Sequence, residues 1–328
     1  MNTSVNENST FSQWGELWYS NIQVGVSKSQ CVNLRCSLNH LYRYIGDMPI
    51  KSIKAYNIDT IISELATKNP NTLRPMGKKT LRDIKNTASR VFDVAIENEV
   101  SCSNPAHNRK IPRRAPQGER RALTLVEQKL IVNTMHKMRI AALIMMLAGL
   151  RRGELIPLMW SDIDIDNFKI TINKSVEQTS SNGFTVKSGT KTDRYGRVVE
   201  IPIDLAIEID DAKKVATSKY VCCKSDGGMH TPTTWKRMWA NYIKTVQKQN
   251  SDAKYTQINE ITAHYLRHTY ATLLYMSGVD VLTAAKLLGH SDIKTTIAIY
   301  THLEKMMVDK SVEKLDNYIS DRLFGGTR

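Results

Sequence analysis

Apolar residues in the first hundred positions recur every three or four residues, which is the period of one buried face of an α-helix. The segment FSQWGELWYSNI begins the pattern. The same period returns in three further segments, residues 29–45, 57–68 and 78–100. Either Asn57 or Asp59 is suited to cap the third of these helices. We therefore predict a four- or five-helix domain over residues 11–105, preceded by a polar, disordered N-terminus over residues 1–10.

The stretch NPAHNRKIPRRAPQGERR, residues 104–121, interrupts the helical pattern with three prolines, one glycine and six basic side chains. Prolines at this density prevent a helix and favour an extended connection. We assign residues 106–121 to a basic linker that can lie along a phosphate backbone, with a plain solvated linker as the alternative. The candidate DNA contacts in this linker are Arg109, Lys110, Arg113, Arg114, Arg120 and Arg121.

A second domain, residues 122–328, mixes helical and strand patterns. In LTLVEQKL, Thr124 is suited to cap a helix, and Glu127 has the spacing of a capping box. The apolar run IAALIMMLAGL is about half of the ~20 residues that a membrane span needs, so we predict a buried helix. The segments FKITIN and VVEIPI alternate as strands do, and the helical period returns from Thr231 to about Asp321. The fold is therefore predicted to be mainly α with a small antiparallel β-sheet (α+β).

The charge balance indicates an anionic partner. The chain carries 46 Lys and Arg against 32 Asp and Glu, a formal net charge of +14. Such an excess favours nucleic acid, although a protein can be basic without this partner. The five cysteines are an odd number without a zinc-binding spacing, which favours free thiols in a reducing compartment. The N-terminus lacks the features of a secretory signal. We expect a cytoplasmic protein that acts on nucleic acid and not on a membrane.

Two short stretches carry paired charges. In GLRRGEL, Arg151 and Glu154 share one face of a helix, so the carboxylate can orient the guanidinium; otherwise both are surface charges. In HYLRHTYAT, His264 and Arg267 lie on one side of an otherwise buried helix. A buried arginine without a negative partner is costly, so an acidic side chain or a ligand phosphate must approach it. A metal site at His264 and His268 is disfavoured, because the stretch lacks a glutamate and a third ligand.

A third stretch, LLGHSDIKTTIAIYTHL, completes the set of candidate residues. Gly289 is suited to end one helix, His290 follows it, and Tyr300 lies ten residues further along. Taken alone, Tyr300 has the character of a packed tyrosine. The order Arg, His-x-x-Arg, His and Tyr over the three stretches is much more specific than any single member.

These stretches, with the lysine-containing hairpin before them, resemble the tyrosine recombinases of the phage integrase family over about Arg121 to Asp321. The first domain resembles that family's core-binding (SAM-like) domain. The resemblance implies that the two domains form a C-shaped clamp around double-stranded DNA. It also implies a homotetramer on specific core or attachment sites and an accessory DNA-bending or excision factor. The segment after Tyr300 is expected to be a helix that packs on a neighbouring subunit, or otherwise closes its own domain.

The resemblance also assigns roles to matching positions. The implied catalytic set is Arg151, Lys191, His264, Arg267, His290 and the nucleophile Tyr300, with Glu154 in support of Arg151. His264 is expected to act as a base or proton relay. Lys191 is the implied hairpin lysine that gives a proton to the leaving 5′ oxygen. The hairpin is longer than is usual for the family, so Lys187 stays open as an alternative.

The activity implied is that of a site-specific recombinase or integrase, which cleaves and rejoins duplex DNA through a 3′-phosphotyrosyl intermediate during integration and excision of a phage or mobile element. Neither a metal ion nor another cofactor is implied. A Xer-like resolvase is the nearest alternative, and a type IB topoisomerase shares the chemistry. A non-cleaving DNA-binding regulator on the same fold is disfavoured, because a binder has no need of the whole catalytic set.

Overall fold

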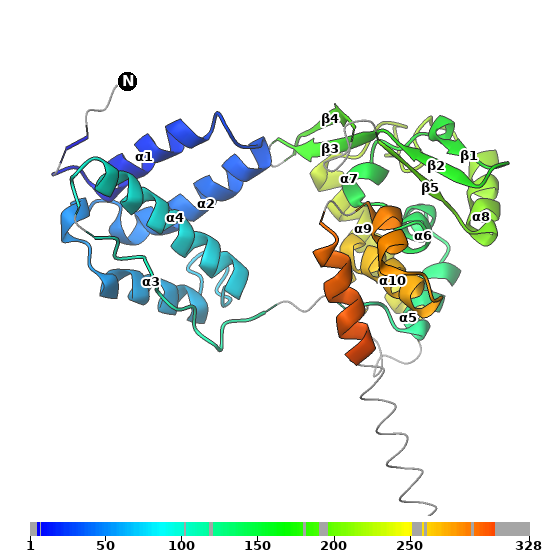
Figure 1. Cartoon of the computed structure of the whole chain (residues 1–328). Helices are drawn as coiled ribbons and strands as arrows, with labels where there is room; N and C mark the ends of the chain where they lie inside the picture. The colour runs from blue at the N-terminus through cyan, green and yellow to red at the C-terminus, as the bar shows by residue number, and fades with distance from the viewer. Residues whose placement is uncertain are drawn as a thin grey trace, which may run out of the picture. The chain divides into compact units, whose positions relative to one another are not determined.

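The computed structural model divides the chain into two compact units, Met1–Glu119 and Arg120–Arg328 (Figure 1). The residues that it describes are 5, 6, 8–101, 103–117, 121–179, 182–189, 196–250, 258, 261–289 and 292–305. The predicted fold, mainly helical with a small antiparallel sheet component, is confirmed. Among the described residues, no helix is both long and apolar enough to cross a membrane.

The first unit is built from helices that each bury one apolar stripe. The helices are α1 (Phe11–Ile22), α2 (Lys28–Ile45), α3 (Ala55–Thr67) and α4 (Lys78–Glu97), with the short 3-10 helix η1 (Ile50–Ser52) between α2 and α3. Helix α4 packs against the other three α-helices. Phe11, Trp14 and Phe92 are almost completely buried, and the Phe11 and Phe92 rings have centroids 5.4 Å apart. These aromatic side chains form the centre of the unit's core.

Two expectations near helix starts were wrong. Helix α3 begins at Ala55, before either predicted cap, and the Asn57 side chain accepts a hydrogen bond from the Lys54 backbone N–H at 2.8 Å. The described residues before α1 are not disordered. Ser9 is buried, and its carbonyl accepts a hydrogen bond from the Ile50 backbone N–H at 3.1 Å, while Thr10 caps α1.

The predicted linker is mostly part of the first unit. Ala106 and Ala115 are buried in its core, and the Pro116 carbonyl accepts a hydrogen bond from the Lys78 backbone N–H at 2.8 Å. The assignment of residues 106–117 to a free connection was therefore wrong. Proline and arginine dominate the composition, but the small alanines between them fit against the helices while the cations stay outside. Residues 118–120, with the candidate Arg120, lie outside the described residues.

The second unit is centred on helix α6 (Arg139–Leu147), in which every residue from Ile140 to Met146 is buried. The predicted buried helix is therefore confirmed. Helix α6 packs against four of the other helices, α5, α7, α8 and α10. The remaining helices are α5 (Leu125–Asn133), α7 (Arg152–Leu155), α8 (Ile203–Lys214), α9 (Pro232–Lys248), α10 (Ala263–Met276), α11 (Val281–Leu288) and the 3-10 helix η2 (Trp160–Asp162). Residues 294–305 are also helical. The capping box of Thr124 and Glu127 at α5 is confirmed.

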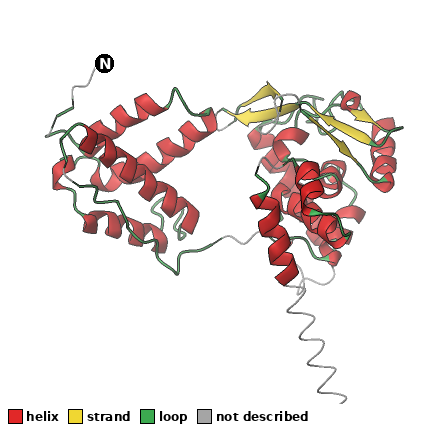
Figure 2. Ribbon diagram, in the orientation of Figure 1, coloured by secondary structure: helices red, strands yellow, loops and turns green. Residues whose placement is uncertain are grey.

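The strands of the second unit form two small antiparallel sheets, which lie together on one side of that unit (Figure 2). The first contains β1 (Ile163–Asp164), β2 (Lys169–Ile172) and β5 (Arg197–Glu200), with Ile170 opposite Val199. Strands β3 (Lys174–Gln178) and β4 (Phe184–Ser188) form a separate hairpin. The second predicted strand ends at Glu200, because Pro202 cannot donate to a ladder and caps α8 instead. Strands β3 and β4 were not predicted from the pattern, since their mostly polar residues do not alternate clearly between buried and exposed.

Substitution of Ala106 by aspartate tests the packing of the former linker segment. The carboxylate would enter a fully buried apolar position, so the free energy of unfolding should fall by about 2–4 kcal/mol. Chemical denaturation of the whole chain, followed by circular dichroism, measures this change. His107→Asp is the matched control, since His107 is exposed and should change stability by less than about 0.5 kcal/mol. Equal effects of the two substitutions would contradict the packing.

Candidate active site

The carboxylate of Glu154, at the start of α7, is shared by two arginines. It accepts hydrogen bonds from the Arg151 backbone N–H at 2.9 Å and from Arg151 Nη1 at 2.7 Å. Arg197, the first residue of β5, donates through Nη1 at 2.8 Å and Nη2 at 3.0 Å. The side chain of Glu154 is only 3% exposed. The predicted pairing of Arg151 with Glu154 is therefore present, but Arg197 was not foreseen.

The charges around Glu154 keep it ionised in a buried position. Burial favours the neutral acid and raises the pKa of Glu154, but the hydrogen bonds and charge of Arg197, followed by those of Arg151, outweigh it. The net result lowers the pKa to about 2, from an ordinary value of 4.5. A permanently charged carboxylate can therefore fix the direction of both guanidinium groups.

Arg267, on the first turns of α10, is held by two main-chain carbonyl groups. Its Nη1 donates to the Gly149 carbonyl and its Nη2 to the Leu288 carbonyl. Only 4% of Arg267 is exposed, and burial together with the nearby charge of Arg151 lowers its pKa to about 9. From the sequence, an acid or a phosphate was expected beside Arg267. Carbonyl dipoles satisfy the N–H groups without cancelling the positive charge, so the attraction for an anion remains.

Two glycines let these carbonyls approach the arginines. Gly149 and Gly289 have φ values of +66° and +59°, in the left-handed region. A Cβ atom on Gly149 would lie 2.2 Å from the Tyr270 ring, and one on Gly289 would lie 2.7 Å from Arg197 Cζ. The Gly289 carbonyl also accepts a hydrogen bond from Arg151 Nη2 at 2.6 Å. Arg151, Arg197 and Arg267 therefore converge on the turns that follow α6 and α11.

His264 lies on the first turn of α10 and is exposed. Together with Arg267 it lines a cavity of about 290 Å³, where a histidine side chain can reach a bound group. The other residues around this cavity are His268, Ala271, Leu288, Thr295, Ala298 and Ile299. The structure thus brings the two members of the His-x-x-Arg stretch to one cavity. Within the described residues, no group of three or more His, Cys, Asp or Glu side chains is placed to hold a metal ion.

Tyr300 lies in the helical segment 294–305, and its hydroxyl is bound to a main-chain carbonyl. The hydroxyl donates a hydrogen bond to the Val279 carbonyl at 3.1 Å, and the ring packs on Tyr275 with centroids 5.0 Å apart. Burial, followed by the negative charge of Asp280, raises the pKa of Tyr300. In this arrangement the hydroxyl is protonated and bound to the main chain.

The other candidate residues either lie outside the described residues or are engaged in ion pairs. Lys191 and His290 lie outside the described residues. The alternative lysine, Lys187, forms an ion pair with Glu177 across the β3–β4 hairpin. Arg121 is bound by the buried Glu127 through two hydrogen bonds, of 2.5 and 2.6 Å. Arg121 is therefore engaged inside its own unit, which weakens its candidacy as a DNA contact.

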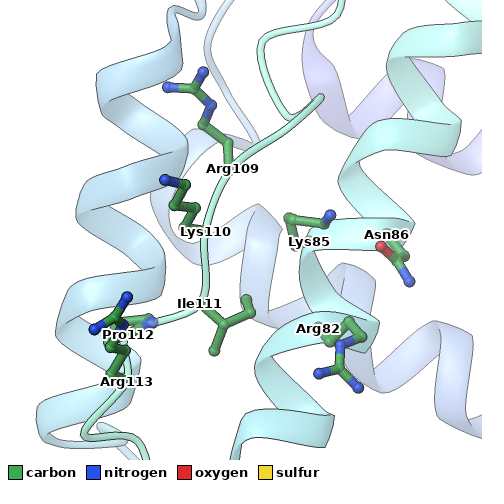
Figure 3. A pocket seen from close by; sticks show the side chains of 8 residues that line it. All are labelled: Arg82, Lys85, Asn86, Arg109, Lys110, Ile111, Pro112 and Arg113. Carbon is green, nitrogen blue, oxygen red and sulfur yellow. The ribbon is translucent and has the colours of Figure 1, made fainter.

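A basic groove lies on the first unit, between α4 and the segment that was predicted to be a linker (Figure 3). Its volume is about 610 Å³. The residues that line it are Arg82, Lys85, Asn86, Arg109, Lys110, Ile111, Pro112 and Arg113. Five of the eight are cationic and none is acidic. Arg82 and Lys85 on α4 were missed by the sequence analysis, because cations on the outer face of a helix resemble an ordinary solvated surface.

Comparisons with known proteins agree with this architecture. Residues 121–307 match the phage integrase family. A XerC-like tyrosine recombinase from Caldanaerobacter subterraneus subsp. tengcongensis is 28% identical to the chain, and the alignment covers 85% of the chain and 76% of that protein. The integrase of transposon Tn1549, solved in complex with transposon right-end DNA, has a TM-score of 0.76 at 19% identity, over 94% of this chain and 100% of that one. A lambda integrase tetramer bound to a Holliday junction has a TM-score of 0.63 at 17% identity, over 89% of this chain and 77% of that one.

The fold and these matches define a tyrosine recombinase, so the resemblance noted in the sequence is confirmed. Because the family match covers more than half of the chain, the chain belongs to the phage integrase family.

Substitution of Glu154 by glutamine tests the charge at the centre of the arginine cluster. The folded-state pKa of Glu154 lies below its ordinary value of 4.5, so its ion pairs stabilise the fold above about pH 4.5 and are lost as pH falls towards 2. The variant should be less stable than the native chain by on the order of 3 kcal/mol at neutral pH, and the difference should shrink between pH 5 and pH 2.

Unfolding by urea over this pH range measures the difference. Glu208→Gln is the matched control, because Glu208 also pairs with an arginine, Arg139, but its side chain is 36% exposed. It should cost about 1 kcal/mol or less. A stability difference for Glu154→Gln that does not vary with pH would contradict the ionised, doubly paired carboxylate.

Proposed function

We propose that this chain is a site-specific integrase that cleaves and rejoins duplex DNA through a 3′-phosphotyrosyl intermediate, and so integrates and excises a phage or another mobile element. The observation that carries the proposal is that Arg151 and Arg267 bind the neighbouring carbonyls of Gly289 and Leu288, while Arg267 and His264 line one cavity. All three side chains lie in the part of the chain that matches the integrase family.

The proposed chemistry begins with attack of the Tyr300 oxygen on a DNA phosphate. Negative charge grows on the non-bridging oxygens, and Arg151 and Arg267 offer N–H donors to it, each worth about 3–4 kcal/mol when preorganised. His264 serves as base or proton relay. The bond from phosphorus to the 5′ oxygen breaks as the bond to tyrosine forms. A 5′-hydroxyl of a second DNA strand later reverses the step, so the energy of the phosphodiester is kept.

Lys191 and His290 complete the proposed set. Lys191 gives a proton to the leaving 5′ oxygen, and His290 donates a further hydrogen bond to the phosphate. The ion pair between Lys187 and Glu177 favours Lys191 over Lys187 for the first role, since Lys187 already neutralises an acid in its hairpin.

The hydroxyl of the nucleophile has to release a hydrogen bond before it can attack. A reactive geometry needs the tyrosine oxygen about 3–3.5 Å from phosphorus, whereas here the hydroxyl of Tyr300 is bound to the Val279 carbonyl. We therefore propose that the helical segment 294–305 shifts when DNA binds and releases this hydrogen bond. The same shift would also release the Tyr300 ring from Tyr275.

Duplex DNA is the proposed substrate, contacted by both units and processed by a homotetramer in the bacterial cytoplasm. The solved relatives carry DNA, and one of them is a tetramer on a Holliday junction. We assign the basic groove of the first unit to the DNA backbone, because its lining residues are mainly cationic. The charge of Arg109 is partly neutralised by Asp59, with which it pairs at 3.2 Å. Arg114 and Arg120 stay proposed DNA contacts on the strength of the sequence alone. An accessory DNA-bending or excision factor is expected as a further partner.

A Xer-like resolvase is the second candidate, and the similarity to a XerC-like recombinase favours it. The two functions share the chemistry and differ in the DNA on which the chain acts. Recombination between two sites on one molecule without a mobile element would identify the resolvase.

Tyr300→Phe should bind DNA with a dissociation constant within about twofold of the native value and form no covalent adduct, because only the nucleophilic oxygen is removed. The test uses nicked duplexes from the DNA that flanks the gene and a denaturing gel. Tyr275→Phe is the matched control, since this neighbouring tyrosine packs against Tyr300 and should keep cleavage. An adduct that persists in Tyr300→Phe would overturn the nucleophile assignment.

Replacement of Arg82 and Lys85 by glutamine tests the groove. If both contact phosphates, the double variant should bind DNA at least about tenfold more weakly near 0.1 M salt, and the slope of log K against log salt should fall by about 2. Fluorescence anisotropy in a salt series measures both quantities. The control replaces Lys28 and Lys68, which are exposed cations outside the groove. If the slope of log K against log salt is equal for the two double variants, the groove does not contact DNA.

A further inference from the structure

Of the three arginines Arg151, Arg197 and Arg267, Arg197 has no role in the proposed catalytic mechanism. Its side chain is 10% exposed, and both of its Nη atoms donate to Glu154. Arg151, by comparison, has a side chain that is 30% exposed. Its two terminal nitrogens are directed at the buried carboxylate of Glu154, so we assign Arg197 no direct contact with a DNA phosphate. Any effect of Arg197 on catalysis therefore acts through its neighbours.

The first neighbour is the carboxylate that orients Arg151. Glu154 accepts four hydrogen bonds, two from Arg151 and two from Arg197. If Arg197 is removed, each carboxylate oxygen loses one donor and the carboxylate can turn about its axis. The Arg151 guanidinium would then lose its fixed direction, while the Arg151 backbone would stay at the start of α7.

The second neighbour is the turn after α11. The Arg197 guanidinium lies where a Cβ on Gly289 would otherwise be, with Nε, Nη1 and Cζ all within 2.8 Å of that position. The Gly289 carbonyl binds Arg151, and the preceding carbonyl, of Leu288, binds Arg267. Arg197 therefore packs on the turn whose carbonyls hold both candidate catalytic arginines.

The third neighbour is the start of strand β5. Arg197 is opposite Ile172 at the end of the β2–β5 ladder where β5 begins. Its ion pair with Glu154 therefore fixes the start of β5 to the base of α7.

We propose that Arg197 is a positioning residue for DNA cleavage, which holds Glu154, the 288–289 turn and the start of β5 in one arrangement. This role rests on the proposed function. Arginine is required because its planar fork binds both carboxylate oxygens and covers the glycine at once; a lysine offers a single point charge on a flexible stem.

The test compares Arg197→Lys with Arg139→Lys. Arg139 is a matched control, because it also binds a carboxylate through two hydrogen bonds, to Glu208 at 2.5 and 2.6 Å, but has no contact with the candidate site. Single-turnover cleavage of a nicked core-site duplex should be about 10- to 100-fold slower in Arg197→Lys, and within about twofold of native in Arg139→Lys. DNA affinity should stay within about twofold in both variants.

Two modified scissile phosphates separate positioning from a general loss of structure. A 5′-bridging phosphorothiolate leaves as a thiolate and needs no proton, so it should restore cleavage if proton donation to the leaving oxygen is impaired. A methylphosphonate carries one less negative charge, so it should restore cleavage if Arg151 is displaced. Restoration by either substrate to within about fivefold of the native rate on that substrate supports positioning by Arg197.

Three results would overturn the proposal, and they are distinguishable. Equal cleavage rates for Arg197→Lys and Arg139→Lys would show that Arg197 has no positioning role. If the native chain cleaves DNA in the same experiment, the proposed function would still stand. A slow Arg197→Lys variant that neither modified substrate restores would mean that Arg197 serves the fold alone. A native chain that forms no adduct on any of the substrates would overturn the proposed function, and the positioning role with it.

Discussion

The ionised carboxylate of Glu154 is the interaction on which the arrangement of the candidate site depends. A buried acid is unstable unless its charge is matched, and here two guanidinium groups match it from two different elements of the fold. Arg151 comes from the turn after the central helix α6, and Arg197 comes from the edge of the three-stranded sheet. The ion pairs thus connect the helical core to the sheet at the place where a phosphate is proposed to bind.

The excess of positive charge around this carboxylate makes the site attractive to an anion. Three arginines surround one glutamate, and Arg267 is compensated by carbonyl dipoles and not by a second acid. The excess of arginines lowers the pKa of Glu154, whereas burial, followed by the charge of Arg151, lowers the pKa of Arg267. A phosphodiester is suited to relieve the excess of positive charge, because it brings negative charge to donors that are already oriented. The site is therefore stable enough to fold and still attractive to an anion.

Several helices and part of the candidate site could be predicted from the sequence, because periodicity and local spacing indicate local structure. The buried helix α6, the cap at Thr124 and the pairing of Arg151 with Glu154 all depend on residues within a few positions of each other. Arg197 could not be found in that way, since it is 43 residues from Glu154 and meets it only through the sheet register. The packing of Ala106 and Ala115 was missed for a related reason. The prolines and cations around these alanines indicated a linker. The alanines are nevertheless buried, because they pack against helices that are distant in sequence.

The decisive measurement is the identity of the residue that becomes joined to DNA. Native protein would be trapped on a nicked duplex and digested with trypsin, and the DNA-bound peptide would be analysed by mass spectrometry. We expect the peptide of residues 295–305, joined through Tyr300 to a 3′-phosphate. A peptide from elsewhere in the chain, or a bond to a 5′-phosphate, would overturn the proposed mechanism.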